Sequence, residues 1–157
     1  AFLCAPLVLA ACSPAEDTPP EPEQATAPAP PARPRAALVP EDIEGAALSG
    51  ELACAFSEGE NGAPLLFARA DVRDESIAEG LLKLGPSAVA LRSADAGGFN
   101  ALVDGARFTS GDLTATIAVT SSEPLGDGES PPRAATLTVE SAALAPDRVE
   151  GRWTCGP

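Results

Sequence analysis

The stretch DLTATIAVT, residues 112–120, alternates apolar and polar side chains with a period of two. Its apolar residues, from Leu113 to Val119, would face one side of an extended chain, and the threonines at positions 114, 116 and 120 would face the other. This period is typical of a β-strand with one buried face. The stretch therefore predicts an all-β fold in which each strand packs one face against a shared core.

The same period recurs on both sides of this stretch. Further strands are expected at 52–56, 65–72, 88–92, 136–140 and 149–155. Residues 74–84 fit either a short helix, which Gly80 would weaken, or a strand. Trp153, Phe56 and Phe67 are the expected core aromatics. About seven to eight short strands predict a small antiparallel barrel or a sandwich, and the pattern does not choose between the two.

An apolar run ends at Leu9-Ala10-Ala11-Cys12-Ser13 and is followed at once by proline-rich sequence. The pattern resembles the lipobox of bacterial lipoproteins. The resemblance implies a cleaved signal peptide over 1–11 and lipidation of Cys12. Because Ser13 follows the cysteine, it also implies sorting to the outer membrane, with the domain in the periplasm. The chain contains no Met, so we expect its true start to precede residue 1. A buried strand or helix is the alternative for this run.

Composition changes sharply after about residue 40. Nine of the 17 Pro lie between Pro14 and Pro40, whereas all 14 Gly lie at Gly45 or beyond. A Pro/Ala/Glu segment buries too little apolar area to offset its ordering entropy. We therefore expect a disordered linker over 12–44, which could also be a docking motif for a polyproline-binding domain, and a β domain over 45–157.

The four cysteines are not equivalent. Cys4 would leave with the signal peptide and Cys12 would carry the lipid. Cys54 and Cys155 then remain as a pair in an exported protein, where disulfides persist, and their bond would join the first strand to the last. Two free buried thiols are the alternative. A zinc site at these two cysteines is a weaker alternative, because the chain has no His to complete the ligand set.

The formal net charge of -13 argues against a nucleic-acid partner and favours a basic protein. The absence of His removes the commonest general base. Paired carboxylates remain as candidates for acid–base work or calcium binding, in the clusters Asp71/Asp74/Glu75 and Asp127/Glu129. Neither cluster has the spacing of a calcium loop, so we expect solvated turns. We expect no enzyme activity, no cofactor and no metal.

The segment Gly105-Ala106-Arg107-Phe108-Thr109 is followed by Gly111. It is similar to the Gly-x-Arg-Tyr segment of the membrane-bound C-type lysozyme inhibitors, which are small periplasmic barrels on lipoprotein anchors. The resemblance implies partner binding through Asp104, Gly105, Arg107 and Phe108. Asp104 stands where that family has Ser, and no Lys follows Lys83, so the inhibitory pair of the family is missing. The ending, Gly151 to Gly156, also resembles uncharacterised proteobacterial lipoproteins.

Together these patterns predict a lipid-anchored outer-membrane lipoprotein whose non-catalytic β domain binds a partner or associates with the envelope. The alternative is an inhibitor of a basic envelope hydrolase such as C-type lysozyme. A third hypothesis, a hydrolase that uses the acidic clusters, has less support. The expected partners are the membrane, through the lipid on Cys12, and a basic envelope protein.

Overall fold

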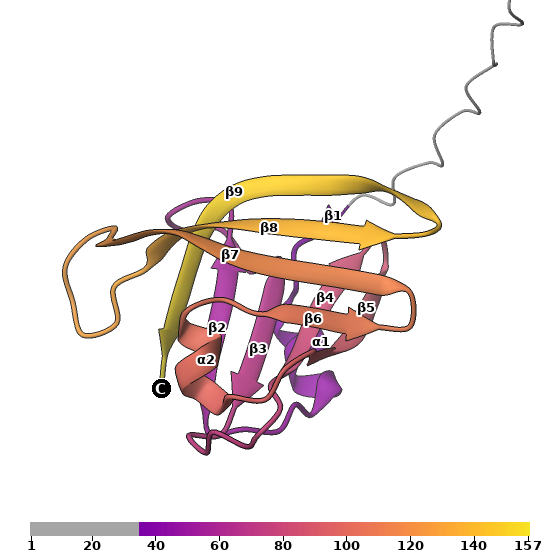
Figure 1. Ribbon diagram of the computed structural model, residues 1–157. Coiled ribbons are helices and arrows are strands. Elements are labelled where there is room, and N and C mark those ends of the chain that lie inside the picture. The colour runs from indigo at the N-terminus through magenta and orange to yellow at the C-terminus, as the bar shows by residue number, and fades with distance from the viewer. Residues whose placement is uncertain (1–34) are drawn as a thin grey trace, which may run out of the picture.

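A meandering antiparallel β-sheet that closes on itself forms the body of the protein (Figure 1). The computed structural model describes residues 35–157, so the expected signal peptide, Cys12 and most of the expected linker lie outside the described residues. The strands are β1 (Arg35–Ala36), β2 (Leu52–Ser57), β3 (Leu66–Ala70), β4 (Glu79–Leu84), β5 (Ser87–Ser93), β6 (Arg107–Ser110), β7 (Leu113–Pro124), β8 (Arg133–Ser141) and β9 (Leu144–Gly156). The two helices are α1 (Pro40–Ala46) and α2 (Gly98–Val103).

Eight of these strands make a closed barrel. From β2 to β9 each strand pairs with the next, and β9 pairs back with β2, always antiparallel. Closure gives every barrel strand a neighbour on both sides, although β5 pairs with β6 only at Arg92 and Ser93. The expected all-β fold is confirmed, and of the two architectures left open the barrel is the correct one.

Residues 113–120 of the stretch lie in β7, one of the two longest strands, and Asp112 belongs to the turn before it. It pairs with β8 from Thr114 opposite Glu140 to Val119 opposite Ala135. Leu113, Ala115 and Ile117 are buried, as the alternation predicts.

Side chains fill the interior of the barrel. Trp153, Phe56 and Phe108 are each no more than 1% exposed and lie among buried leucines. An eight-stranded barrel is just wide enough for its side chains to fill it. The expectation that Phe67 joins this core is wrong. On β3 the buried residues are Leu66, Ala68 and Ala70, so the period of two turns Phe67 to the outer face, where it is half-buried.

The ambiguous segment 74–84 forms β4 from Glu79 onward. Gly80 faces the core there, and a Cβ atom at this position would lie 3.2 Å from the ring of Phe108. The glycine that weakens a helix thus makes room for an aromatic ring inside the barrel.

The disulfide between Cys54 and Cys155 is present, as expected. The two cysteines lie directly opposite each other where β2 pairs with β9. The bond therefore joins the first and last strands of the barrel at the point where the sheet closes.

Two elements precede the barrel within the range expected as linker. β1 pairs with the end of β4, Arg35 opposite Leu84, and the Arg35 guanidinium donates to Asp147 and Glu58, which raises its pKa above the ordinary value. α1 begins at Pro40, a position where proline suits a helix. An ion pair of 2.6 Å joins Asp42 of α1 to Lys83 of β4. Both elements thus contact the barrel.

The Asp42–Lys83 ion pair is expected to make the stability of the fold depend on pH. The hydrogen bond from Lys83, and a second from the Val39 backbone N–H, lower the pKa of Asp42 below the ordinary value of about 3.9 for an aspartate. Because the folded pKa is lowered, the stabilising contribution is present above the unfolded pKa and is lost as pH falls through the folded one. We expect Lys83→Met to raise the pKa of Asp42, as measured by carboxyl NMR titration.

The matched control is Arg92→Met, which removes a different cation of the barrel. It should leave the titration of Asp42 unchanged. An unshifted Asp42 in Lys83→Met would contradict the assigned cause.

Within residues 35–157, no helix is long and apolar enough to cross a membrane.

Candidate functional site

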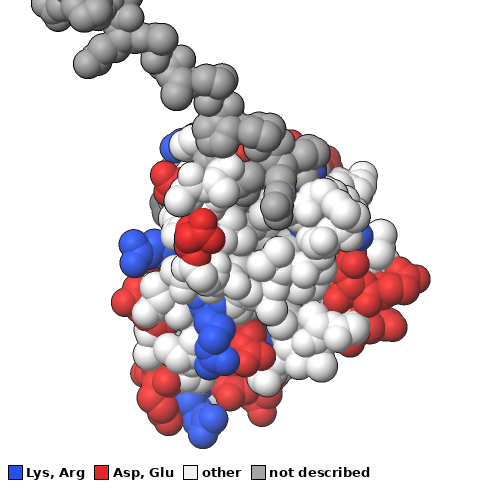
Figure 2. All heavy atoms as spheres, turned by 90° about the vertical axis from the view of Figure 1, so that its right-hand side faces the viewer, with Lys and Arg blue, Asp and Glu red and all other residues white. Residues whose placement is uncertain are grey.

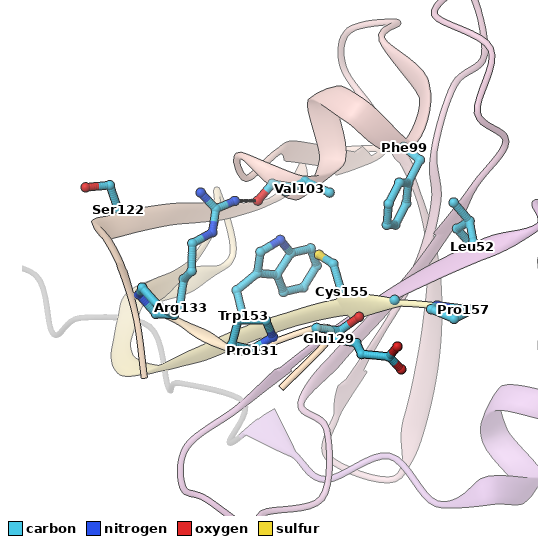
Figure 3. Close-up of a pocket in the computed structure, with 13 residues that line it drawn as sticks. Leu52, Phe99, Val103, Ser122, Glu129, Pro131, Arg133, Trp153, Cys155 and Pro157 are labelled. Atoms are coloured by element: carbon cyan, nitrogen blue, oxygen red, sulfur yellow. Dashed lines mark hydrogen bonds between the residues drawn. The ribbon is translucent and has the colours of Figure 1, made fainter. Parts of the chain in front are cut away.

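A pocket of about 470 Å³ lies at the end of the barrel where β2 begins and β9 ends (Figure 3). Its walls come from α2, from the loop between β7 and β8, and from the ends of β2 and β9. Leu52, Phe99, Val103, Trp153 and Cys155 supply apolar lining. The size falls within the range typical of ligand pockets, about 300–1,000 Å³.

Trp153 stands at the centre of this site (Figure 3). It lies on β9, and its indole N–H donates a 3.0 Å hydrogen bond to the carbonyl of Leu102 in α2. The residue is only 1% exposed, so the expected core role is confirmed. The same residue is also part of the pocket lining, so a molecule bound there would lie next to the buried indole.

Two glycines allow α2 to form beside Trp153. Gly97 and Gly98 both have positive φ, +146° and +57°. A Cβ atom on Gly98 would lie 2.3 Å from the carbonyl oxygen of Arg73, so no other residue fits without a shift. The tight turn directs Phe99 and Val103 into the pocket lining.

Arg133, at the start of β8, is the cationic group of the pocket. Its guanidinium donates to the carbonyl of Val103 and, at 3.3 Å, to the carboxylate of Asp104. The Arg133 side chain is 23% exposed and that of Asp104 is 79% exposed. Sequence reasoning did not single out Arg133, because no local pattern signals a partner 29 residues away.

The loop between β7 and β8 forms the outer wall. Figure 1 shows it projecting beyond the barrel, and residues 122–130 are all exposed. Gly126 and Gly128 have positive φ, and the Leu125 N–H donates to the carbonyl of Pro132. Glu123 lies near the end of β7, and the loop carries Asp127 and Glu129, of which Glu129 lines the pocket.

The four residues implied by the lysozyme-inhibitor resemblance have different surroundings. Asp104 and Arg107 are exposed. Gly105 has φ +100°, and a Cβ atom there would lie 2.5 Å from the carbonyl oxygen of Ile117. Gly105 and Arg107 line a separate, smaller pocket of about 180 Å³. Phe108 is 0% exposed, so its ring packs in the barrel core and is not offered to a partner.

The acidic clusters show no metal-binding arrangement. Asp71 pairs with Arg73, and Asp74 accepts a 3.4 Å hydrogen bond from Asn100. In the part of the chain from residue 35 onward, no three His, Cys, Asp or Glu residues gather closely enough to hold a metal ion. Glu129 is the acidic residue of these clusters that reaches the pocket.

No protein-family model matches the chain, and comparisons with curated proteins and with solved structures found no match. The resemblances to lipoproteins and to lysozyme inhibitors therefore stay predictions.

Proposed function

We propose that this protein is a lipid-anchored lipoprotein of the bacterial outer membrane whose barrel is a non-catalytic binding module. The pocket beside Trp153 carries the proposal. Because side chains fill the barrel interior, a ligand would have to bind outside it, and this pocket offers apolar lining together with a few polar groups.

Two features support the location of the module. The sequence Leu9-Ala10-Ala11-Cys12-Ser13 supplies a site for the lipid anchor, followed by a proline-rich spacer. The Cys54–Cys155 disulfide suits an oxidising compartment such as the periplasm, since such bonds are rare in the cytosol.

Intact-mass analysis of the protein from membrane fractions tests the anchor. We expect the mature chain to begin at Cys12 and to carry the mass of the acyl groups. Cys12→Ala should lose that mass and leave the membrane fraction. An unmodified Cys12 in the membrane fraction would refute the anchor.

Site-specific photocrosslinking in the native envelope tests the binding module. Ser130 lines the pocket and is exposed, so a photoreactive residue at this position should capture the partner. Ser87 is exposed as well but is not part of the pocket lining, and it serves as the matched control position. Equal crosslinking from the two positions, or none from Ser130, would argue against the pocket as the binding site.

Inhibition of a basic envelope hydrolase is the second candidate function. Its support is the exposed pair Asp104 and Arg107 in the segment similar to the lysozyme inhibitors, together with a net charge that would steer a cationic enzyme. An assay with the full chain against C-type lysozyme tests it. We expect inhibition that Arg107→Glu weakens, and no inhibition at stoichiometric excess would rule the candidate out.

A further inference from the structure

The pocket has two chemically distinct parts. Its floor is apolar, with Trp153, Phe99, Leu52 and Val103 among the lining residues. Figure 3 shows the Arg133 guanidinium and the Glu129 carboxylate on opposite sides of the indole. A ligand that fits must therefore place an apolar group on the floor and a polar or charged group at the rim.

The charge at the rim is unevenly compensated. Arg133 is already paired with Asp104 and hydrogen-bonded to Val103. Glu123, near the end of β7, and the loop carboxylates Asp127 and Glu129, by contrast, have no Lys or Arg within ion-pair distance among the described residues. On the opposite side of the barrel, basic side chains lie among the acidic ones (Figure 2). Glu129 and Arg133 are the charged residues among those that line the pocket, and Asp104 compensates Arg133. The uncompensated charge at and beside the pocket is therefore negative and favours a cationic ligand.

The same charge argues against several other occupants. The chain's own segment 13–34 contains four acidic residues and a single basic one, Arg33, so it would be repelled. A second copy of the chain carries a net charge of -13 as well. Nucleic acids and anionic lipid headgroups are excluded for the same reason.

We propose that the pocket binds a cationic segment of a partner protein, in which basic residues flank an apolar side chain. The apolar side chain packs against Phe99 and Val103, next to the buried indole of Trp153, and the flanking basic residues pair with Glu129 and the neighbouring Asp127. The inference rests on the proposed binding function and specifies the chemistry of its partner.

Trp153 provides a direct measurement, because it is the only Trp of the chain and the chain has no Tyr. We would titrate the full chain with a short blocked peptide of alternating arginine and leucine and record Trp153 emission. We expect a saturable change that high salt weakens. A peptide of alternating glutamate and leucine, and one of alternating arginine and serine, should produce no saturable change.

Variants of the pocket lining test whether the peptide binds in this pocket. Val103→Phe puts a larger side chain into the lining and should weaken binding about tenfold. Val72→Phe, at an exposed position outside this pocket, is its control and should bind like the wild type. Glu129→Lys should weaken binding about threefold to tenfold, whereas Glu140→Lys, which changes the net charge equally on the outside of β8, should not.

Three outcomes would overturn the proposal: no saturable change with the arginine–leucine peptide, equal binding of the glutamate–leucine peptide, or equal effects of Glu129→Lys and Glu140→Lys. Because Glu129 is an exposed loop residue, this last comparison holds even if Val103→Phe fails to fold. If the peptide fails while a photoreactive group at Ser130 still captures a partner, the cationic ligand is wrong and the binding module stands. If both fail, the binding function itself is wrong.

Discussion

The double variant Cys54→Ala/Cys155→Ala is expected to lose about 4–5 kcal/mol of its free energy of unfolding. The disulfide closes a loop between residues 101 positions apart, and in the chain-entropy model a loop of about 100 residues contributes about 4.7 kcal/mol. The effect acts mainly on the unfolded chain. Without the disulfide, the first and last strands of the barrel are free to separate in the unfolded state, which raises its entropy. Urea unfolding followed by circular dichroism measures the change.

Reduction of the wild-type protein provides the matched control for this variant. Reductant should lower the stability of the wild type to that of the double variant and should leave the double variant unaffected. Alanine is the replacement of choice, since Cys54 is buried and a serine hydroxyl there would need a partner. A loss below about 1 kcal/mol would show that pairing of β2 with β9 alone holds the barrel closed.

Trp153→Ala is expected to lower the free energy of unfolding by about 3–5 kcal/mol. The indole is the largest fully buried side chain of the core, and its removal leaves a cavity and breaks the hydrogen bond that ties β9 to α2. The Leu102 carbonyl keeps its 3.0 Å hydrogen bond from the Gly105 N–H. The loss of the indole should therefore destabilise the packing of α2 on the barrel as well as the barrel itself. Circular dichroism is the suitable probe, because the variant has no Trp left.

Two further variants separate these contributions. Trp153→Phe keeps an aromatic ring in the core but removes the N–H donor, so it should cost clearly less than the alanine variant. Val72→Ala, at a position 54% exposed, should change the stability by no more than about 0.5 kcal/mol. If Trp153→Ala were as mild as Val72→Ala, the indole would not support the core as described.

Local patterns predicted most of the strands. The alternation at 112–120 appears in β7, and the paired cysteines form the expected disulfide. A pattern of period two indicates that a strand has two different faces, but it does not always indicate which face is buried. For that reason the pattern predicts Phe67 in the core although it faces outward. The resemblance to lysozyme inhibitors implies partner binding for Phe108, which instead fills the core.

The elements and contacts that sequence reasoning missed depend on the folded barrel. α1 lies in a range whose composition resembles a linker, and Lys83, far away in the sequence, holds Asp42 against the barrel. Arg133 gains its role because α2 brings Val103 and Asp104 to it. The spacing of neighbouring residues in the sequence predicts none of these contacts.

Periodicity, composition and residue type are local properties, and they are enough to predict the all-β class, the cysteine pair and the acidic charge. The sequence also carries the prediction of a lipid anchor at Cys12. Closure of the sheet into a barrel is visible only in the folded chain, because it depends on β9 pairing with β2 about 100 residues away. The pocket beside Trp153 follows from the same closure, since β2, β9, α2 and the projecting loop meet there only after the chain has folded.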